Sequence, residues 1–453
     1  MNSTEIVDLT DEQPPYQQPE KKLTSSVHDL NAKDPPFGSR FLLDPTLTFT
    51  QNAWDHVPPP ADQGNSIAAS LARQRAAPVP DSERSKLNSK PANFWNNFYK
   101  NNEANFFKDR KWLFNEFPDL ISASKPGAGS LKIAEIGCGA GNSIFPVLAA
   151  NQNPELELYA YDYSGHAVKL VQRNPLYTSP PCGTIHSAVW DLSSFSFNSD
   201  NLDSDSLPPG LSPASVDIVI LVFVLSALHP DEWAFAIQNI HRILKPGGKV
   251  LFRDYGRYDL TQLRFKNGRL MGDNFYKRGD GTRVYFFELD ELSLFFTGEW
   301  LSKEDKQRAN YGTNVKHVVE EEEEGDESGT PLGGGLTLVS TTVGTPDPDP
   351  ESSATVASVD TLNISTSLKE GVTHGEVEPE PQAAAEEIHP NLLDPSFPSR
   401  SRSRTSSSVS DSNSVSSPLF TALSIGIDRR LIVNRKRQLK MYRVWMQGIF
   451  QRV

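Results

Sequence analysis

The segment Ile133–Asn142, IAEIGCGAGN, decides the fold. A short apolar strand runs through Ile136 into a loop with three glycines, Gly137, Gly139 and Gly141, and a helical pattern follows at once. Because glycine tolerates a positive φ and has no Cβ, a ligand can approach the bare backbone of such a loop beside the amides of a helix N-terminus. The spacing GxGxG departs from the dinucleotide fingerprint GxGxxG. The segment therefore predicts a nucleotide-type pocket, and the rest of the chain must decide the ligand.

Strands and helices alternate after this segment. The strand LELYAYD ends at Asp162, where a carboxylate can accept both hydroxyls of a ribose. A third strand, 184–189, is followed by Asp191, which either hydrogen-bonds an adenine amino group or caps the following turn. The continuous apolar run Val216–Leu225 is typical of a central parallel strand. The repeat predicts parallel strands with helical crossovers between them.

This pattern predicts an α/β fold with a Rossmann-like, doubly wound sheet of seven strands. The last two strands, Ile425–Asn434 and Lys440–Phe450, are rich in β-branched and aromatic residues and would form an antiparallel pair. A long insertion precedes them, and loop-closure entropy grows slowly enough to permit it. Ligands of such a sheet bind beyond the carboxyl ends of its strands, where Gly137, Asp162, Asp191, Arg253 and Asp254 would all lie.

Composition divides the chain into five parts. We expect a disordered tail at 1–35, an arm and linker at 36–92, the first part of the sheet domain at 93–300, a disordered acidic and Ser-rich insertion at 301–417, and the last strands at 418–453. Aromatic residues within 37–57 indicate an arm that packs on the main domain or covers its ligand. With two cysteines, neither a zinc site nor a disulfide framework is expected.

The net charge of −13 hides two basic regions. Residues 301–417 hold 8 Lys and Arg against 21 Asp and Glu, so everything outside them sums to zero. Within that remainder, 241–283 holds 11 basic and 4 acidic residues, and 428–453 holds 8 and 1. Such regions are either solvated surface or the electrostatic footprint that a polyanion needs. No apolar run is long enough to span a bilayer, and the acidic N-terminus is unlike a leader, so a soluble protein is expected.

Aromatic and basic residues are interleaved in two places. From Asn93 a helical pattern places Trp95 and Tyr99 on one face, which favours a core role. The motif NFFKD then brings Lys108 and Arg110 beside several aromatic rings. Residues 253–283 mix Arg, Lys and Tyr in a way that suits phosphates and unstacked bases.

A glycine loop after the first strand, an acidic end to the second, an Asp after the third and a seven-strand α/β unit together describe a methyltransferase that binds S-adenosylmethionine. The sequence also resembles the methyltransferase-like family of tRNA 3-methylcytidine methyltransferases, in its cytosolic anticodon-loop branch. The resemblance covers roughly 37–57, 93–297 and 421–447, and the acidic insertion has no counterpart in it. The motifs that carry it are FGSRFLLDP, FWNNFYK, NFFKDRKWLFNEFP, IGCGAGNSIFP, FVLSALHP, LKPGGKVLFRDYGRYDLTQLRF, NFYKRGDGTRVYFF and DRRLIVNRKRQLKMYRVW.

The resemblance implies S-adenosyl-L-methionine as the cofactor, no metal, and tRNA as the partner, with cytidine 32 of the anticodon loop as the target. It implies a cytoplasmic protein, allows a nuclear pool, and allows a helper such as an aminoacyl-tRNA synthetase or an anticodon-binding subunit. Trp95 and Tyr99 would then form a lid whose rings shield the cationic sulfonium. The cofactor contacts that it implies are Trp95, Tyr99, Gly137, Gly139, Asp162, Asp191 and Val222.

The expected chemistry depends on positioning. N3 of neutral cytosine carries a lone pair, so in-line attack on the methyl carbon needs no general base. A carboxylate near the ring, for which we select Asp254, could stabilise the developing positive charge. The base must be splayed out to expose N3. Residues predicted to hold the surrounding phosphates are Lys108, Arg110, Arg253, Arg257, Lys277, Arg278, Arg283, Arg429 and Arg430.

Two alternatives share part of this pattern. A small-molecule or protein methyltransferase would have the same cofactor half but would not need the cations of 253–283 and of the C-terminus to converge. A non-catalytic RNA-binding subunit would keep the basic surface and lose the glycine loop and Asp162, and here both are intact.

Overall fold

The computed structural model describes residues 40–60, 63–110, 112–194, 207–310, 388–400 and 418–453. The expected tail at 1–35 lies outside these ranges, as does most of the insertion. Among the described helices, none is long and apolar enough to cross a membrane.

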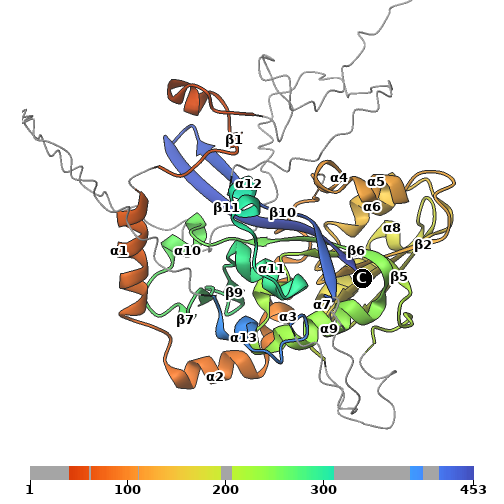
Figure 1. Cartoon of the computed structure of the whole chain (residues 1–453). Coiled ribbons are helices and arrows are strands. Elements are labelled where there is room, and N and C mark those ends of the chain that lie inside the picture. Colours follow the sequence, from red (N-terminus) through yellow and green to blue (C-terminus); the bar gives the residue numbers. More distant parts are fainter. Residues whose placement is uncertain (1–39, 61–62, 111, 195–206, 311–387, 401–417) are drawn as a thin grey trace, which may run out of the picture.

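An eight-stranded sheet forms the centre of the molecule, in the order β1-β10-β11-β6-β5-β2-β3-β4 (Figure 1). Its middle is parallel, and β11 joins β6 antiparallel. The predicted C-terminal pair is therefore confirmed as the completion of the sheet. The strands are β2 (Leu131–Ile136), β3 (Leu156–Asp162), β4 (Thr184–Val189), β5 (Val216–Val222), β6 (Leu244–Tyr255), β10 (Phe420–Asn434) and β11 (Leu439–Arg452).

Both faces of the sheet are covered by helices. Successive side chains of β5 point to opposite faces, so they enter two different hydrophobic cores. Val219 and Leu221 join the core that contains Trp233 of α9 (Trp233–Ile243). Ile218 and Ile220 join the second core, with α6 (Ile144–Ala150) packed on it. This is the doubly wound arrangement that the sequence predicts.

The arm extends the sheet rather than covering the ligand site. It forms η1 (Pro45–Thr50) and β1 (Ala53–Asp55), and β1 pairs antiparallel with β10, Trp54 opposite Leu431. The Trp54 indole Nε1 donates to the Thr48 carbonyl at 2.8 Å. Figure 1 shows β1 beside the β10–β11 hairpin. Of the two roles considered for the arm, packing on the domain is the observed one, and it adds an eighth strand to the predicted seven.

The remaining elements surround this sheet and include a small antiparallel sheet, β7-β8-β9, that follows β6. Gln74 of the first helix anchors that helix by donating to the Gln262 carbonyl at 2.8 Å. These elements are α1 (Gln63–Arg75), α2 (Asp81–Ser89), α3 (Pro91–Asn102), α4 (Leu113–Glu116), α5 (Pro118–Ala123), α7 (Gly165–Arg173), α8 (Pro175–Thr178), η2 (Leu225–Ala227), η3 (Pro230–Glu232), α10 (Leu260–Arg264), β7 (Leu270–Gly272), β8 (Phe275–Lys277), β9 (Arg283–Tyr285), α11 (Leu289–Thr297), α12 (Lys303–Asn310) and α13 (Pro390–Leu393).

Two parts of the expected insertion are ordered, which differs from the expectation of disorder throughout 301–417. Residues 303–310 form α12, and 388–400 pack against α11. Leu392 and Phe397 are buried there, and the Ser399 hydroxyl donates to the Phe295 carbonyl at 2.6 Å. The physical reason is a short apolar cluster, NLLDPSF, whose burial offsets the entropy of ordering.

Gly298 tests how tightly this docked segment is held. Its φ is +74°, and a Cβ built on it would lie 2.2 Å from the Ser399 carbonyl oxygen. Gly298→Ala is therefore expected to lower the free energy of unfolding by about 2–3 kcal/mol, from left-handed strain plus overpacking. Gly127→Ala is the matched control, because φ is +77° there and nothing lies within 4 Å of the added Cβ. Urea denaturation that gives equal losses for both variants would contradict the docked contact.

Candidate active site

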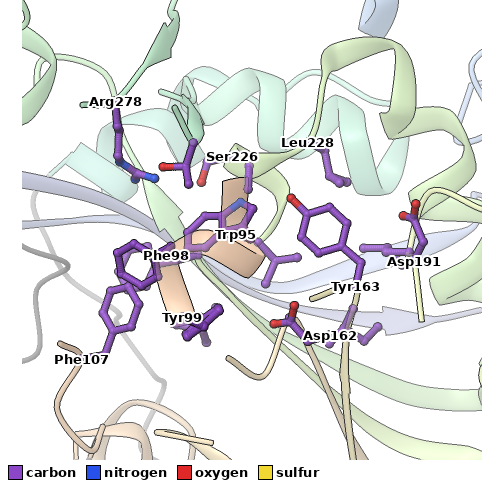
Figure 2. A pocket seen from close by; sticks show the side chains of 18 of the residues that line it. Trp95, Phe98, Tyr99, Phe107, Asp162, Tyr163, Asp191, Ser226, Leu228 and Arg278 are labelled. Carbon is purple, nitrogen blue, oxygen red and sulfur yellow. The ribbon is translucent and has the colours of Figure 1, made fainter. Parts of the chain in front are cut away.

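One pocket lies at the carboxyl ends of β2, β3, β4 and β5 (Figure 2). Its lining includes most of the residues predicted to contact the cofactor, brought together from four strands and α3. These residues are Trp95, Tyr99, Gly137, Asp162, Asp191 and Val222. Gly139 lies immediately behind the lining, where a Cβ on it would come within 2.3 Å of the Tyr99 hydroxyl oxygen.

The loop after β2 requires glycine at its turns. Gly137, Gly139 and Gly141 have φ values of +66°, +54° and +89°. The Asp162 carboxylate fixes this loop, because its Oδ2 accepts from the Gly139 N–H at 2.9 Å and its Oδ1 accepts from the Ser164 N–H at 2.8 Å. Glycine is needed here for a second reason: a Cβ on Gly137 would lie 2.6 Å from Val224, and one on Gly141 would lie 2.4 Å from Phe145.

Two buried carboxyl groups support this end of the pocket. Burial raises the pKa of Asp162 to about 6, against the two backbone N–H groups that lower it. Burial also raises the pKa of Glu135 to about 7. Glu135 accepts from the Ile144 N–H at 2.9 Å and so holds the start of α6, and Arg110 Nη1 lies 3.5 Å from it. Only Asp162 of the two faces the pocket.

Aromatic rings form one wall of the pocket. Trp95 and Tyr99 lie one helical turn apart on α3, with ring centroids 6.0 Å apart and stacked. Phe98 contacts Phe106 edge-on at 4.9 Å, and Phe107 continues the wall. The face of α3 that periodicity indicates as core therefore contributes Trp95 and Tyr99 to the lining of the pocket.

Asp191 caps the turn after β4 and also lines the pocket. Its Oδ1 accepts from the Ser193 N–H at 2.9 Å and the Ser193 hydroxyl at 2.7 Å, so it does cap the turn after β4. The side chain is also part of the pocket wall, on the same side as Asp162 (Figure 2). Both interpretations considered from the sequence are compatible with this placement.

The other end of the pocket combines rings and cations. The Arg110 guanidinium carbon lies 5.6 Å from the centroid of Phe223, and that of Arg278 lies 5.4 Å from Tyr255. Phe223 and Tyr255 are themselves 4.9 Å apart. Phe223 has a φ of +60°, which is uncommon for an aromatic residue and typical of strained functional positions. Rings beside guanidinium groups suit a planar, polar base.

Asp254 does not lie in the pocket, which corrects its selection as the catalytic carboxylate. Its side chain is fully buried, and its oxygens accept from the Ser226 N–H at 3.0 Å and from the Tyr255 N–H at 2.9 Å. Burial raises its pKa to about 6. Because Ser226 and Tyr255 line the pocket, Asp254 fixes the backbone behind the wall and does not face the substrate.

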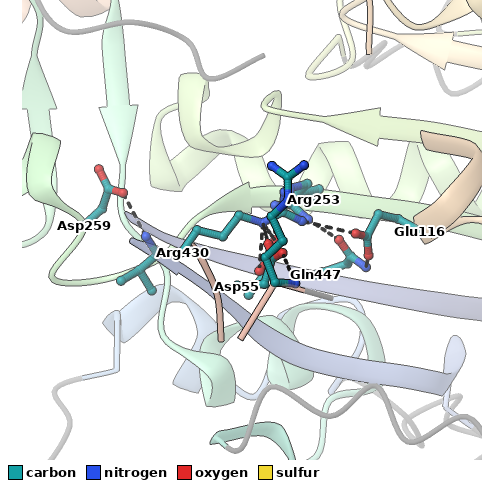
Figure 3. Close-up of polar contacts among 9 residues, drawn as sticks. Asp55, Glu116, Arg253, Asp259, Arg430 and Gln447 are labelled. Atoms are coloured by element: carbon teal, nitrogen blue, oxygen red, sulfur yellow. Dashed lines mark hydrogen bonds and ion pairs between the residues drawn. The ribbon is translucent and has the colours of Figure 1, made fainter. Parts of the chain in front are cut away.

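Arg253 and Arg430 are not available to phosphates, contrary to the prediction. Arg253 is sandwiched between Trp112 and Trp445, at 4.7 and 4.8 Å, and pairs with Asp428. Arg430 pairs with Asp428, Asp55 and Glu116 (Figure 3). Both side chains are 4% exposed. A buried guanidinium needs carboxylate partners, and here acidic residues on β1, β10 and α4 supply them.

Three more of the predicted phosphate ligands are engaged in ion pairs. Arg257 is buried against Glu288 and Glu291, at 3.4 and 3.7 Å. Arg283 is 2% exposed and pairs with Glu232 at 3.1 Å. Lys277 pairs with Glu83 of α2 at 2.6 Å. Of the remaining predicted cations, Arg110 and Arg278 line the pocket, Lys108 is exposed and Arg429 is half-buried.

Several lining residues were missed by sequence reasoning. Phe106 and Phe107 were visible as aromatic residues in NFFKD but received no role. Tyr163 directly follows the predicted ribose ligand, so its position alone could have marked it. Phe223, Ser226 and Thr282 carry no pattern that distinguishes them from neighbours.

Comparison with known proteins places this site in a family. A methyltransferase domain model matches residues 134–250. The tRNA N(3)-methylcytidine methyltransferase trm140 of Schizosaccharomyces pombe is 44% identical over 274 residues, which is 60% of this chain and 84% of that protein. The chain belongs to the tRNA N3-methylcytidine methyltransferase family. The tRNA N(3)-cytidine methyltransferase METTL2 of Danio rerio supports this, at 41% identity over 60% of this chain and 81% of the relative.

Two other similarities mark the extent of the match. The tRNA(Thr) (cytosine(32)-N(3))-methyltransferase of Saccharomyces cerevisiae is 46% identical over 58% of this chain, which spans only 40% of that relative's length. A solved methyltransferase from Methanosarcina mazei is 18% identical, covering 40% of this chain and 82% of that one at a TM-score of 0.29. Family membership confirms the predicted fold class and S-adenosylmethionine as the cofactor.

The pocket fits this cofactor. It offers a glycine loop without Cβ atoms, a carboxylate at the tip of β3 and an aromatic wall against which a sulfonium can lie. The role of each residue stays a prediction.

Cofactor affinity is expected to depend on the charge of Asp162. Its pKa of about 6 means that it is ionised above pH 6 and carries a proton below it. Because ribose hydroxyls donate to the ionised form, S-adenosylhomocysteine should bind about fivefold more weakly at pH 5 than at pH 8, with the change centred near pH 6. Calorimetric titration across this range measures it. Asp162→Asn should flatten the profile, and an unchanged profile in that variant would assign the titration to another group.

Proposed function

We propose that this protein transfers the methyl group of S-adenosylmethionine to N3 of a cytidine in tRNA, at position 32 of the anticodon loop. The observation that carries the proposal is the division of the pocket into two ends. Asp162 and Asp191 offer acceptors for a nucleoside at one end, and Arg110, Phe223 and Arg278 offer rings and donors for a planar base at the other. The names of the relatives in yeasts and fish support the same substrate.

The residues that line the pocket suit a methyl transfer that needs no general base. N3 of cytosine attacks with its own lone pair, so the protein must hold the ring in line with the methyl group and exclude water. Phe223 and Tyr255 can hold the flat ring, while Arg110 or Arg278 can donate to its carbonyl oxygen. The product ring is a cation, and the aromatic faces tolerate that charge. Bound cofactor supplies the activated methyl group.

The tRNA backbone must then be held by cations other than the buried ones. The turn between β10 and β11 presents exposed side chains at Arg435, Lys436 and Arg437, and Lys440 is exposed at the start of β11. Lys108 is exposed beside the aromatic wall. Because exposed cations release counterions when they meet phosphates, these residues support tRNA binding with a strong salt dependence.

Nucleoside mass spectrometry tests the function. Purified protein is incubated with total tRNA that lacks this modification, with and without S-adenosylmethionine, and in parallel with cell extract that can supply a helper protein. Cofactor-dependent appearance of 3-methylcytidine is the expected result. A different methylated nucleoside, or none even with extract, would overturn the proposal and favour a small-molecule or protein substrate.

A further inference from the structure

The hydroxyl group of Tyr163 is buried in the pocket wall without a hydrogen-bond partner among the residues that the structure describes. Tyr163 directly follows Asp162 at the end of β3, and Figure 2 shows its hydroxyl pointing away from Asp191 toward the middle of the pocket. A buried hydroxyl without a partner costs free energy, so native proteins rarely keep one unless a ligand or water completes it. The hydroxyl therefore needs a polar partner, which a bound molecule or a water can supply.

No neighbouring cation is placed to satisfy this hydroxyl. Among the charged groups that influence its pKa, the strongest effect comes from Arg283. Its guanidinium already donates to the Ala227 carbonyl at 3.3 Å, to Asn88 at 3.2 Å and to Glu232 at 3.1 Å. Burial raises the pKa of Tyr163 well above its ordinary value, so the phenol keeps its proton and stays a donor.

The chemistry of the surrounding groups selects the kind of atom that is missing. Asp162 and Asp191 flank Tyr163, and ionised carboxylates only accept hydrogen bonds. They can accept hydrogen bonds from the ribose hydroxyls and from an amino group. They cannot donate to the ring nitrogens of a purine, which are themselves acceptors. The Tyr163 hydroxyl is a buried donor in this pocket and can supply the hydrogen bond that a ring nitrogen accepts.

We propose that the Tyr163 hydroxyl donates a hydrogen bond to a ring nitrogen of the cofactor's adenine and so contributes to selection of an adenine nucleoside. The inference rests on S-adenosylmethionine as the cofactor in the proposed function. It assigns Tyr163 a contact in cofactor binding and no part in methyl transfer, so its removal should change cofactor affinity and KM far more than kcat.

Calorimetric titration of S-adenosylhomocysteine into the full chain and into Tyr163→Phe tests the contact. We expect the variant to bind about three- to tenfold more weakly, the effect of one neutral hydrogen bond. The same titrations with the 1-deaza, 3-deaza and 7-deaza analogues identify the nitrogen, because one analogue should bind both proteins equally while the other two retain the difference.

Tyr161→Phe is the matched control. Its hydroxyl donates to the Pro209 carbonyl at 2.7 Å, and Tyr161 is not among the residues that line the described pocket, so its loss should leave cofactor affinity unchanged. Equal affinity of Tyr163→Phe and the unmodified protein would overturn the inference. An equal loss for all three analogues would also overturn it, because that pattern reports altered packing. Failure of the unmodified protein to bind S-adenosylhomocysteine would instead overturn the cofactor assignment on which the inference rests.

Discussion

Asp162→Ala is expected to weaken S-adenosylhomocysteine binding at least 100-fold and to abolish methyl transfer, while tRNA binding survives. The Asp162 carboxylate lies inside the pocket and accepts from two backbone N–H groups, those of Gly139 and Ser164. Hydrogen bonds to a charged group contribute about 1.5–3 kcal/mol each. Their loss releases the glycine loop and also removes the predicted acceptor for the ribose, which accounts for the size of the effect.

The control for this variant is Asp217→Ala. Asp217 accepts from the Lys132 N–H at 2.8 Å and pairs with Lys245, at the opposite end of β5 from the pocket. Its removal should lower stability without changing cofactor affinity. Calorimetry gives the affinity, and gel-shift titration gives tRNA binding. A folded Asp162→Ala protein that binds the cofactor within fivefold of the unmodified one, or that loses only tRNA binding, would contradict the site.

The sequence predicts best those parts of the fold whose residues are adjacent in the chain. The glycine loop, the apolar run of β5 and the acidic tip of β3 each lie within a few residues, and each is where the sequence predicts it. The parallel pairing of β2 to β6 was predicted from the alternation of strands and helices. The antiparallel pair β10–β11 was visible from its β-branched and aromatic residues, despite the long insertion before it.

The basic residues show where such reasoning fails. A run of Arg and Lys reveals charge, but not which face of a strand each side chain occupies or what lies opposite. Arg430 is 314 residues from Glu116, and Arg253 is 175 residues from Asp428. Those pairings exist only after the sheet assembles, so the sequence could not distinguish a buried ion pair from a phosphate ligand. The turn at 435–438 belongs to the same basic region, but its side chains are exposed.

Arg430→Ala is expected to destabilise the protein by about 3–5 kcal/mol, a size typical of breaking a buried charge network. Arg430 Nε lies 3.3 Å from Asp55 and 3.1 Å from Asp428, and its Nη2 lies 3.3 Å from Glu116. It therefore joins β1, β10 and α4 in one network. Removing it leaves buried carboxylates with fewer positive partners, and their desolvation is no longer offset.

The pH dependence of this loss distinguishes charge from packing. Burial acts to raise the pKa of Asp428, but the guanidinium groups of Arg430 and Arg253 lower it well below its ordinary value. A depressed pKa stabilises the native protein above the unfolded pKa near 4, and this stability is lost as the pH falls. Because native Asp428 stays ionised at pH 4, this contribution is lost only as the pH falls below 4 toward the native pKa. Without Arg430 the contribution shrinks, so the difference between the two proteins should be larger at pH 7.5 than at pH 2.5.

Urea denaturation at both pH values measures the effect, with Arg437→Ala as the control. Arg437 is exposed in the β10–β11 turn, and its removal should change stability by less than about 0.5 kcal/mol. The two variants should also differ in tRNA affinity. Arg437→Ala should weaken tRNA binding and Arg430→Ala should not, because of these two residues Arg437 is the exposed one that can contact a phosphate. If Arg430→Ala kept full stability and weakened tRNA binding instead, the guanidinium would have to reach the surface, and the buried network would not describe the protein in solution.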